Sequence, residues 1–170
     1  MSYFKNIFTT GALAKTPSRV LKKIAKAADL PNLKMVVELG AGKGEITKNL
    51  VKRLESDCRY AAFEINNDFA AELKRKFPQI DVYEEDALNF TQWVNQNADL
   101  VICSLPLSFF EKNERSTLLE KIKQNTAPGG KVVILFHAFW IIPELKEVFP
   151  RYELIRLFHL PPYYIITYTK

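Results

Sequence analysis

The sequence predicts an α/β protein, with a mostly parallel sheet of seven strands and helices on both faces. Three observations predict this fold. Short, nearly continuous apolar runs alternate with segments of helical periodicity, a glycine-rich turn follows the first run, and two apolar runs end the chain without a helix between them. Strands covered on both faces lack polar alternation, so such runs indicate a parallel sheet between helices. The last two runs are expected to form an antiparallel hairpin.

The expected strands are apolar runs that mostly end at Gly, Pro, Asn or Asp, as strands often do. Pro161-Pro162 joins the last two, and Pro128-Gly129-Gly130 is expected to turn the chain before the fifth. The runs span residues 35–39, 60–65, 80–83, 100–105, 131–136, 152–160 and 163–170.

Helices are expected between these strands, where apolar residues recur three or four positions apart. Asn67 or Asp68 is expected to cap the second of them, and Pro143 falls in the first turn of the last. The segments are residues 46–54, 67–77, 90–97, 114–124 and 142–149.

The charge is unevenly distributed along the 170 residues, whose formal net charge is +5. Residues 1–28 contain six of the 24 basic residues and none of the 19 acidic ones. The excess positive charge therefore lies in this segment and indicates an anionic partner, either a membrane surface or nucleic acid. We divide the chain into a basic amphipathic segment, residues 1–30, and a domain, residues 31–170.

Within the basic segment, Thr16 and Pro17 are expected to start a helix. Apolar residues would form one stripe and basic residues would lie mainly outside it. Such a helix can lie on an anionic membrane or pack on the sheet with its basic face in water. Nucleic acid is the less favoured partner, because no base-stacking aromatic residue is interleaved with the basic cluster. The stripe is Val20, Leu21, Ile24 and Ala28, and the basic residues are Lys15, Arg19, Lys22, Lys23 and Lys26.

Composition excludes several other classes of protein. The longest nearly apolar run, residues 132–143, is shorter than the roughly 20 residues that a membrane-spanning helix needs. The sequence has no secretory-signal pattern, so we expect a cytoplasmic protein. Cys58 and Cys103 form no CxxC motif and no Cys/His cluster, so no disulfide framework or metal site is expected.

The first expected strand runs into a glycine-rich turn, Glu38-Leu39-Gly40-Ala41-Gly42-Lys43-Gly44-Glu45. Glycines at a strand-to-helix junction allow a sharp turn and close approach of a ligand. The dinucleotide fingerprint GxGxxG requires glycine where Glu45 stands, and a carboxylate there would repel a pyrophosphate. No GK[ST] follows, which excludes a P-loop. An acidic site suits a cationic ligand better.

Three acidic residues end consecutive expected strands, so they should line one crevice at the carboxyl edge of the sheet. Glu38 and Glu64 lie at the ends of the first and second strands, and Asp86 follows the third. We expect Glu64 to bind ribose hydroxyls and Asp86 to bind an adenine amino group. The expected cofactor-binding residues are Glu38, Gly40, Ala41, Gly42, Gly44, Glu64, Ile65, Asp86, Ala87 and Ser104.

These motifs resemble those of class I S-adenosylmethionine (SAM) methyltransferases. The resemblance rests on residues 37–44, on Glu64, on Glu85-Asp86-Ala87 and on residues 128–130. It implies a Rossmann-like fold whose last strand is antiparallel, SAM as the cofactor, and methyl transfer as the activity.

Two further segments resemble bacterial phospholipid N-methyltransferases and ornithine lipid N-methyltransferases. They are residues 10–19 and Ser104-Leu105-Pro106-Leu107. This resemblance implies methylation of the amine of phosphatidylethanolamine or a related aminolipid at the inner face of the membrane. The oligomeric state is not determined by these motifs.

Three side chains are candidates for catalysis, and each has a structural alternative. Ser104 ends the fourth expected strand, His137 follows the fifth, and Tyr3 belongs to the basic segment. Ser104 would orient the amine, His137 would act as a base, and Tyr3 would close over the cofactor. Leu107 and Phe109 would form a wall for the substrate, although packing in the core explains apolar residues equally well.

Two other functions remain open. The glycine motif also resembles that of rRNA adenine dimethyltransferases, although Ser104-Leu105-Pro106-Leu107 lacks their acidic or amide first residue and aromatic fourth residue. In the first alternative, the chain is a soluble methyltransferase that acts on RNA or on a small molecule. In the second alternative, it is a binding module that retains the fold without catalysis.

Overall fold

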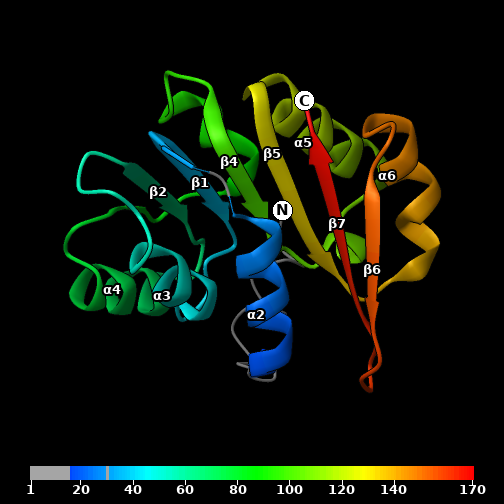
Figure 1. Cartoon of the computed structure of the whole chain (residues 1–170), viewed down its shortest axis with the longest axis horizontal. Helices are drawn as coiled ribbons and strands as arrows, with labels where there is room; N and C mark the ends of the chain where they lie inside the picture. The colour runs from blue at the N-terminus through cyan, green and yellow to red at the C-terminus, as the bar shows by residue number, and fades with distance from the viewer. Residues whose placement is uncertain (1–15, 30) are drawn as a thin grey trace.

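The structure is a computed structural model that describes residues 16–29 and 31–170. Its centre is a seven-stranded sheet with strand order β3-β2-β1-β4-β5-β7-β6 (Figure 1). The strands are β1 Met35–Leu39, β2 Arg59–Phe63, β3 Asp81–Tyr83, β4 Ala98–Cys103, β5 Thr126–Phe136, β6 Glu153–Leu157 and β7 Tyr163–Thr169. All seven expected strands are present, with ends shifted by a few residues.

The register confirms the antiparallel ending. Strands β1 to β5 are parallel to one another, whereas β7 is inserted between β5 and β6 and is antiparallel to both. Tyr164 of β7 pairs with Phe136 at the carboxyl end of β5, and Tyr163 pairs with Leu157 at the end of β6. The turn between β6 and β7 therefore lies beside the carboxyl end of β5.

Helices cover both faces of the sheet. Helices α2, α3 and α4 lie on the face toward the viewer in Figure 1, and α5 and α6 lie on the other. The α-helices are α2 Ser18–Ala27, α3 Glu45–Val51, α4 Asn67–Lys76, α5 Lys112–Gln124 and α6 Ile142–Val148, and the 3₁₀ turns are η1 Ala87–Gln92, η2 Leu107–Phe109 and η3 Phe139–Ile141.

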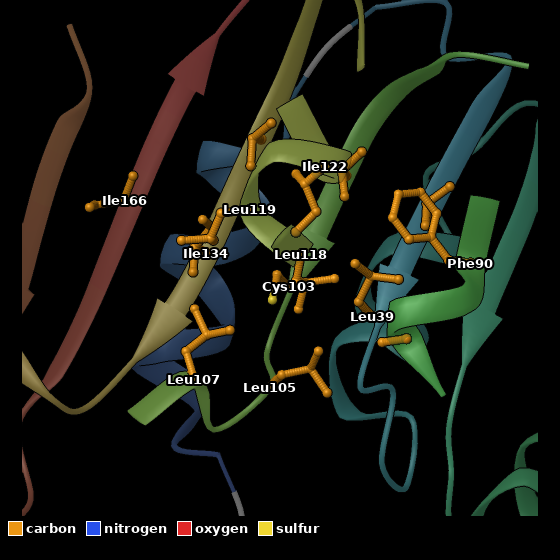
Figure 2. Packing of buried hydrophobic residues seen from close by; sticks show 14 of the residues in the cluster. Leu39, Phe90, Cys103, Leu105, Leu107, Leu118, Leu119, Ile122, Ile134 and Ile166 are labelled. Carbon is orange, nitrogen blue, oxygen red and sulfur yellow. The ribbon is translucent and has the colours of Figure 1, made fainter. Parts of the chain in front are cut away.

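Alternation along the strands divides the core into two layers. In β1, Val37 and Leu39 face the layer under α5 and α6, while Val36 faces the layer under α2, α3 and α4. Figure 2 shows the first layer, in which Leu118 and Ile122 of α5 pack over the sheet. Because apolar side chains are buried on both faces, the central strands read as continuous apolar runs.

Helix α2 packs against the body of the domain through its apolar stripe. Val20, Ile24 and Ala28 are buried in the same layer as α3, α4 and the sheet. The structure thus decides between the two uses of this stripe, because side chains buried against the sheet are withdrawn from a membrane. The cap differs from expectation as well. Pro17 precedes the helix, and Thr16 donates its backbone N–H to Glu45 Oε2 at 2.8 Å.

Other local expectations were wrong in detail. Asn66, not Asn67 or Asp68, caps α4 by accepting the backbone N–H of Phe69. A 3₁₀ turn at residues 87–92 replaces the helix expected at 90–97. Residues 128–130 lie within β5, because the β4–β5 register shifts between the Ala98 and Leu100 pairs and so accommodates the extra residues.

Candidate active site

The glycine-rich turn connects β1 to α3 with a left-handed backbone at all three glycines, Gly40, Gly42 and Gly44. A Cβ on Gly40 would lie 2.8 Å from the Leu105 side chain, so the turn is pressed against the end of β4. A Cβ on Gly42 would meet no atom within 4 Å. Close packing thus requires glycine at position 40, while position 42 leaves open space beside the backbone.

Glu64 lies directly after β2 and faces this turn. Its side chain is only 5% exposed, and its two carboxylate oxygens accept backbone N–H groups from Gly42 at 2.7 Å and Asn66 at 2.8 Å. Burial raises the pKa of Glu64, and the two amide donors oppose that shift. Each oxygen keeps a lone pair, so a fixed carboxylate can still accept hydrogen bonds from ligand hydroxyls.

A cavity of about 250 Å³ lies at the carboxyl ends of β1, β4 and β5. Its wall combines the glycine turn, two carboxylates and a mainly apolar side. Eight expected site residues meet there: Gly40, Ala41, Gly42, Glu64, Ser104, Leu107, Phe109 and His137. Sequence reasoning gave no site role to the others: Thr16, Lys43, Glu45, Ile46, Phe69, Leu105, Pro106, Ser108, Leu135, Phe136, Ala138 and Tyr163.

Glu38 does not line this cavity, although it was expected to bind the cofactor. It is fully buried on the α3 side of the sheet, where Thr47 and Tyr60 donate their hydroxyls to its Oε2 at 2.5 and 2.6 Å. Within the described residues, its Oε1 has no hydrogen-bond partner. Burial raises the pKa of Glu38 to about 7. The carboxyl group therefore ties β1, β2 and α3 together beneath the turn.

Ser104 holds the end of β4 against the glycine turn. Its hydroxyl donates to Gly40 O at 2.7 Å, and its backbone N–H donates to Leu39 O at 3.0 Å. The single hydroxyl proton is therefore engaged, and Oγ can act toward a ligand only as an acceptor.

His137 follows β5 and has a fixed ring. Its Nδ1 lies 2.7 Å from Pro162 O, and the ring packs against Tyr163 with centroids 4.2 Å apart. A carbonyl oxygen can only accept, so Nδ1 carries the proton and Nε2 of the neutral ring keeps its lone pair. Burial and the negative charge of Glu45 raise the pKa of the Tyr163 phenol, which keeps it protonated as a donor.

Glu45 is a site residue that sequence reasoning used only to exclude a dinucleotide. It begins α3, lines the cavity and anchors Thr16 through the hydrogen bond described above. In the described cavity wall the carboxylates of Glu45 and Glu64 outnumber the single lysine, Lys43, so the net negative charge favours a cation.

Arg115 of α5 is a second residue that sequence reasoning missed. It donates to the backbone carbonyls of Leu107 and Phe110 at 3.2 and 2.9 Å, and it pairs with Glu144 of α6 at 2.7 Å. These bonds hold η2, one wall of the cavity, to the helical layer. An arginine in an amphipathic helix gave no signal for this role, because the contact joins distant segments.

Besides Glu38, four more expected cofactor residues lie outside the cavity wall. Gly44 precedes α3, where a Cβ would meet Leu73 and Phe77, so it serves packing. Ile65 is partly exposed just after Glu64. Asp86 caps η1 by accepting the N–H of Leu88, and Ala87 is buried at the start of that turn. Tyr3 and Lys15 lie outside the described residues.

The basic residues of α2 do not line the cavity either. Arg19, at the start of the helix, donates to Phe158 O at 2.7 Å near the β6–β7 turn. Lys23 and Lys26 lie toward the other end of the sheet, where a second hollow also contains Lys131 and Arg151. Lys22 is exposed on the same helix.

Comparison with known proteins places this arrangement in a family. The model of a family described as "Methyltransferase domain" matches residues 36–130, which include the glycine turn, Glu64 and Ser104. The chain belongs to the methyltransferase domain family. The methyltransferase is also 32% identical over 146 residues to an ornithine lipid N-methyltransferase of Singulisphaera acidiphila, with 82% of this chain and 76% of that protein covered.

Two further relatives mark the extent of the similarity. Ribosomal RNA small subunit methyltransferase A of Thermotoga maritima is 36% identical over 81 residues, covering 46% of the methyltransferase and 28% of that protein. The N-methyltransferase NodS of Bradyrhizobium japonicum, solved with S-adenosyl-L-homocysteine, matches with a TM-score of 0.77 at 15% identity, covering 90% and 86% of the two chains. The NodS match shows the shared fold.

The methyltransferase uses SAM as its cofactor, and the cavity fits this cation. Gly42 leaves room where a Cβ would fill the cavity, Glu64 has lone pairs free for hydroxyl groups, and both wall carboxylates favour positive charge. When bound, SAM supplies a methyl group on a positively charged sulfur.

Residues 16–29 and 31–170 contain neither a membrane-spanning helix nor a metal-binding cluster. No helix in these ranges has the length and hydropathy needed to cross a membrane. The same residues contain no group of three His, Cys, Asp or Glu side chains arranged to hold a metal ion.

Proposed function

We propose that this methyltransferase transfers methyl groups to the amine of an aminolipid, such as phosphatidylethanolamine, at the inner face of the membrane. The observation that carries the proposal is the similarity to an ornithine lipid N-methyltransferase over most of both chains. The cavity supports it, because carboxylates that favour cations adjoin apolar residues from η2 and β5. Such a wall suits a charged amine attached to an acyl chain.

The amine must lose its proton before it can attack the methyl group. A positive charge nearby favours loss of the ammonium proton, and His137 Nε2 provides a lone pair to receive it. SAM, held by the glycine turn and Glu64, would supply the methyl group to the neutral amine, and the leaving electron pair would stay on its sulfur. The proton on His137 returns to solvent.

Positioning is the main contribution of the other residues. Ser104 Oγ accepts a hydrogen bond from the amine N–H, because its own proton is held by Gly40 O. Glu45 attracts the ammonium form into the cavity, and the apolar wall containing Leu107 and Phe109 excludes water. Tyr3 and Lys15 precede α2. Closure of Tyr3 over the site and attraction of Lys15 to the membrane stay predictions.

Asp86 and Ile65 complete the proposed cofactor site. Asp86 Oδ1 already accepts the Leu88 N–H, so its Oδ2 is the oxygen proposed to accept from the adenine amino group. Ile65 is exposed next to Glu64 and supplies an apolar surface for the ring.

The test is a lipid methylation assay on vesicles. Purified protein is incubated with SAM and vesicles that contain phosphatidylethanolamine, and a parallel sample contains ornithine lipid. Mass spectrometry should then find lipids heavier by one or more methyl groups. Glu64→Ala provides the control, because weaker SAM binding should reduce methylation. If calorimetry confirms SAM binding but no lipid gains a methyl group, the aminolipid proposal is wrong.

The role of His137 needs a separate measurement. His137→Ala should lower kcat while leaving the KM for lipid and the affinity for SAM close to those of the wild type, because the imidazole acts on the proton and not on binding. An unchanged kcat would remove His137 from the mechanism.

An RNA substrate is the second candidate, and the similarity to ribosomal RNA small subunit methyltransferase A favours it. That match covers 46% of this chain, compared with 82% for the ornithine lipid enzyme. Methylation of ribosomal RNA, with no product in the vesicle assay, would establish this candidate instead.

A further inference from the structure

Large apolar side chains are exposed around one end of the molecule. Five of the eight such side chains found in the described residues come from three loops. We call them the apolar rim: Phe109 (58% exposed), Phe139 (61%), Trp140 (65%), Phe158 (79%) and Leu160 (92%). A patch of this kind is typical of a surface that contacts a membrane or another protein.

The apolar rim lies on three loops that adjoin lining residues of the active-site cavity. Phe109 ends η2 after β4, Phe139 and Trp140 lie in η3 after β5, and Phe158 and Leu160 lie in the β6–β7 turn. Phe109 and His137 line the cavity, and His137 contacts Pro162 of that turn. In Figure 1 the arrowheads of β4 and β5 point downward, toward the end of the molecule where the β6–β7 turn lies.

The charges near the apolar rim suit an anionic surface. The three loops, residues 104–110, 137–142 and 158–162, contain no acidic residue. Two arginines flank the turn, because Arg19 donates to Phe158 O and the guanidinium of Arg156 lies 5.3 Å from the centroid of the Phe158 ring. Apolar side chains with arginines and without acids form the pattern of an interfacial membrane contact.

The chain outside the described residues joins the body at the same end. Thr16 lines the cavity, and α2 begins at the lower end of Figure 1. The fifteen preceding residues include Tyr3, Phe4, Ile7 and Phe8 together with Lys5 and Lys15. This segment therefore contains further apolar and basic side chains.

We propose that the apolar rim inserts into the surface of an anionic lipid membrane and thereby sets the mouth of the cavity against the lipid headgroups. This inference rests on the proposed function and assigns its membrane contact to the rim, whereas the buried stripe of α2 takes no part. An aminolipid would then reach the cavity without leaving the bilayer. Trp140 suits this position because indole rings favour the membrane interface.

The two tryptophans of the chain provide a direct test. Trp93→Phe leaves Trp140 as the reporter in the rim, and the matched Trp140→Phe leaves Trp93, which packs near Tyr83. Vesicles of phosphatidylethanolamine and phosphatidylglycerol are added to each. We expect the emission of Trp140 to shift to shorter wavelength and to be quenched by brominated acyl chains, with no change for Trp93. Cosedimentation without a response from Trp140 would overturn the proposal.

Substitutions in the rim provide a second test. Phe158→Ser combined with Leu160→Ser, or Trp140→Ser alone, should lower vesicle partitioning roughly tenfold or more, because each variant leaves less apolar surface to be buried. Leu154→Ser is the matched control, since Leu154 is exposed within β6, away from the turn. The rim variants should retain activity on a monomeric short-chain aminolipid. If the rim variants bind vesicles as well as the wild type does, the apolar rim is not the membrane contact.

Failure of this inference can be separated from failure of the proposed function. Lipid methylation is measured in the same samples as Trp140 emission. Methylation without a response from Trp140 refutes membrane insertion of the apolar rim and leaves the proposed function in place. A response from Trp140 without methylation refutes the aminolipid function and leaves the membrane contact in place. If Trp140 emission instead depends on protein concentration in the absence of vesicles, a second copy covers the rim and the membrane contact is wrong.

Discussion

The buried carboxyl group of Glu38 should make the stability of the protein depend on pH. Its pKa rises from 4.5 in the unfolded chain to about 7 in the folded protein, mainly because burial penalises the charged form. Between these values the folded state holds a proton that the unfolded state has lost, so the free energy of unfolding falls as pH rises. The pKa difference corresponds to a loss of about 3 kcal/mol, complete above the folded pKa.

Glu38→Gln removes this ionisation with little change in shape. Urea unfolding without SAM, followed by fluorescence from about pH 5 to about pH 8, should show that the variant gains about 3 kcal/mol relative to the wild type across this range. The difference between the unfolding free energies of the two proteins cancels the contribution of Glu64, whose pKa is also raised by folding. Glu120→Gln, on the exposed side of α5, is the control and should show no such trend. A difference that stays constant with pH would refute the reasoning.

Three further predictions follow from the cavity and from α2. Glu64→Ala should weaken SAM binding about 100-fold in calorimetry, because charge-assisted hydrogen bonds to ligand hydroxyls are lost; an unchanged affinity would refute the ribose role. Gly42→Ala should cost about 1 kcal/mol of stability in urea unfolding, since the backbone is left-handed there, and should weaken SAM binding further by filling open space. Reversing Lys22, Lys23 and Lys26 to Glu should reduce vesicle cosedimentation mainly at low salt, since exposed charges act through a screened potential; loss that persists at high salt would assign them direct contact.

Much of the fold followed from periodicity, because burial on both faces of the sheet leaves a local mark. The continuous run from Met35 to Leu39 and the helical spacing in α5 were read correctly for this reason. Helix ends were read less well. Asn66, Asn67 and Asp68 are all good caps, so local sequence does not distinguish them. In the structure the side chain of Asn66 accepts the Phe69 N–H and caps the helix.

Some residues of the site could be predicted from the sequence, and others could not. A glycine turn with Glu64 after the next strand has fixed spacing along the chain, so the cofactor could be predicted from sequence. Glu38 looked equivalent to Glu64, yet strand alternation turns its side chain into the layer beneath α3, where it contacts Thr47 and Tyr60. Arg115 left no local signal, because its partners are separated from it along the chain.

The sequence by itself thus determined the order of elements, the glycine turn and the methyl donor, because these depend on neighbours along the chain. Tertiary structure alone decided that the stripe of α2 is buried, since an apolar stripe has the same periodicity on a membrane as on a sheet. It also brought η2, η3 and the β6–β7 turn to one end of the molecule. Those loops lie far apart in sequence, and the β6–β7 turn reaches the carboxyl end of β5 because β7 runs antiparallel to β5. The exposed side chains of the three loops therefore share one end of the molecule only in the folded chain.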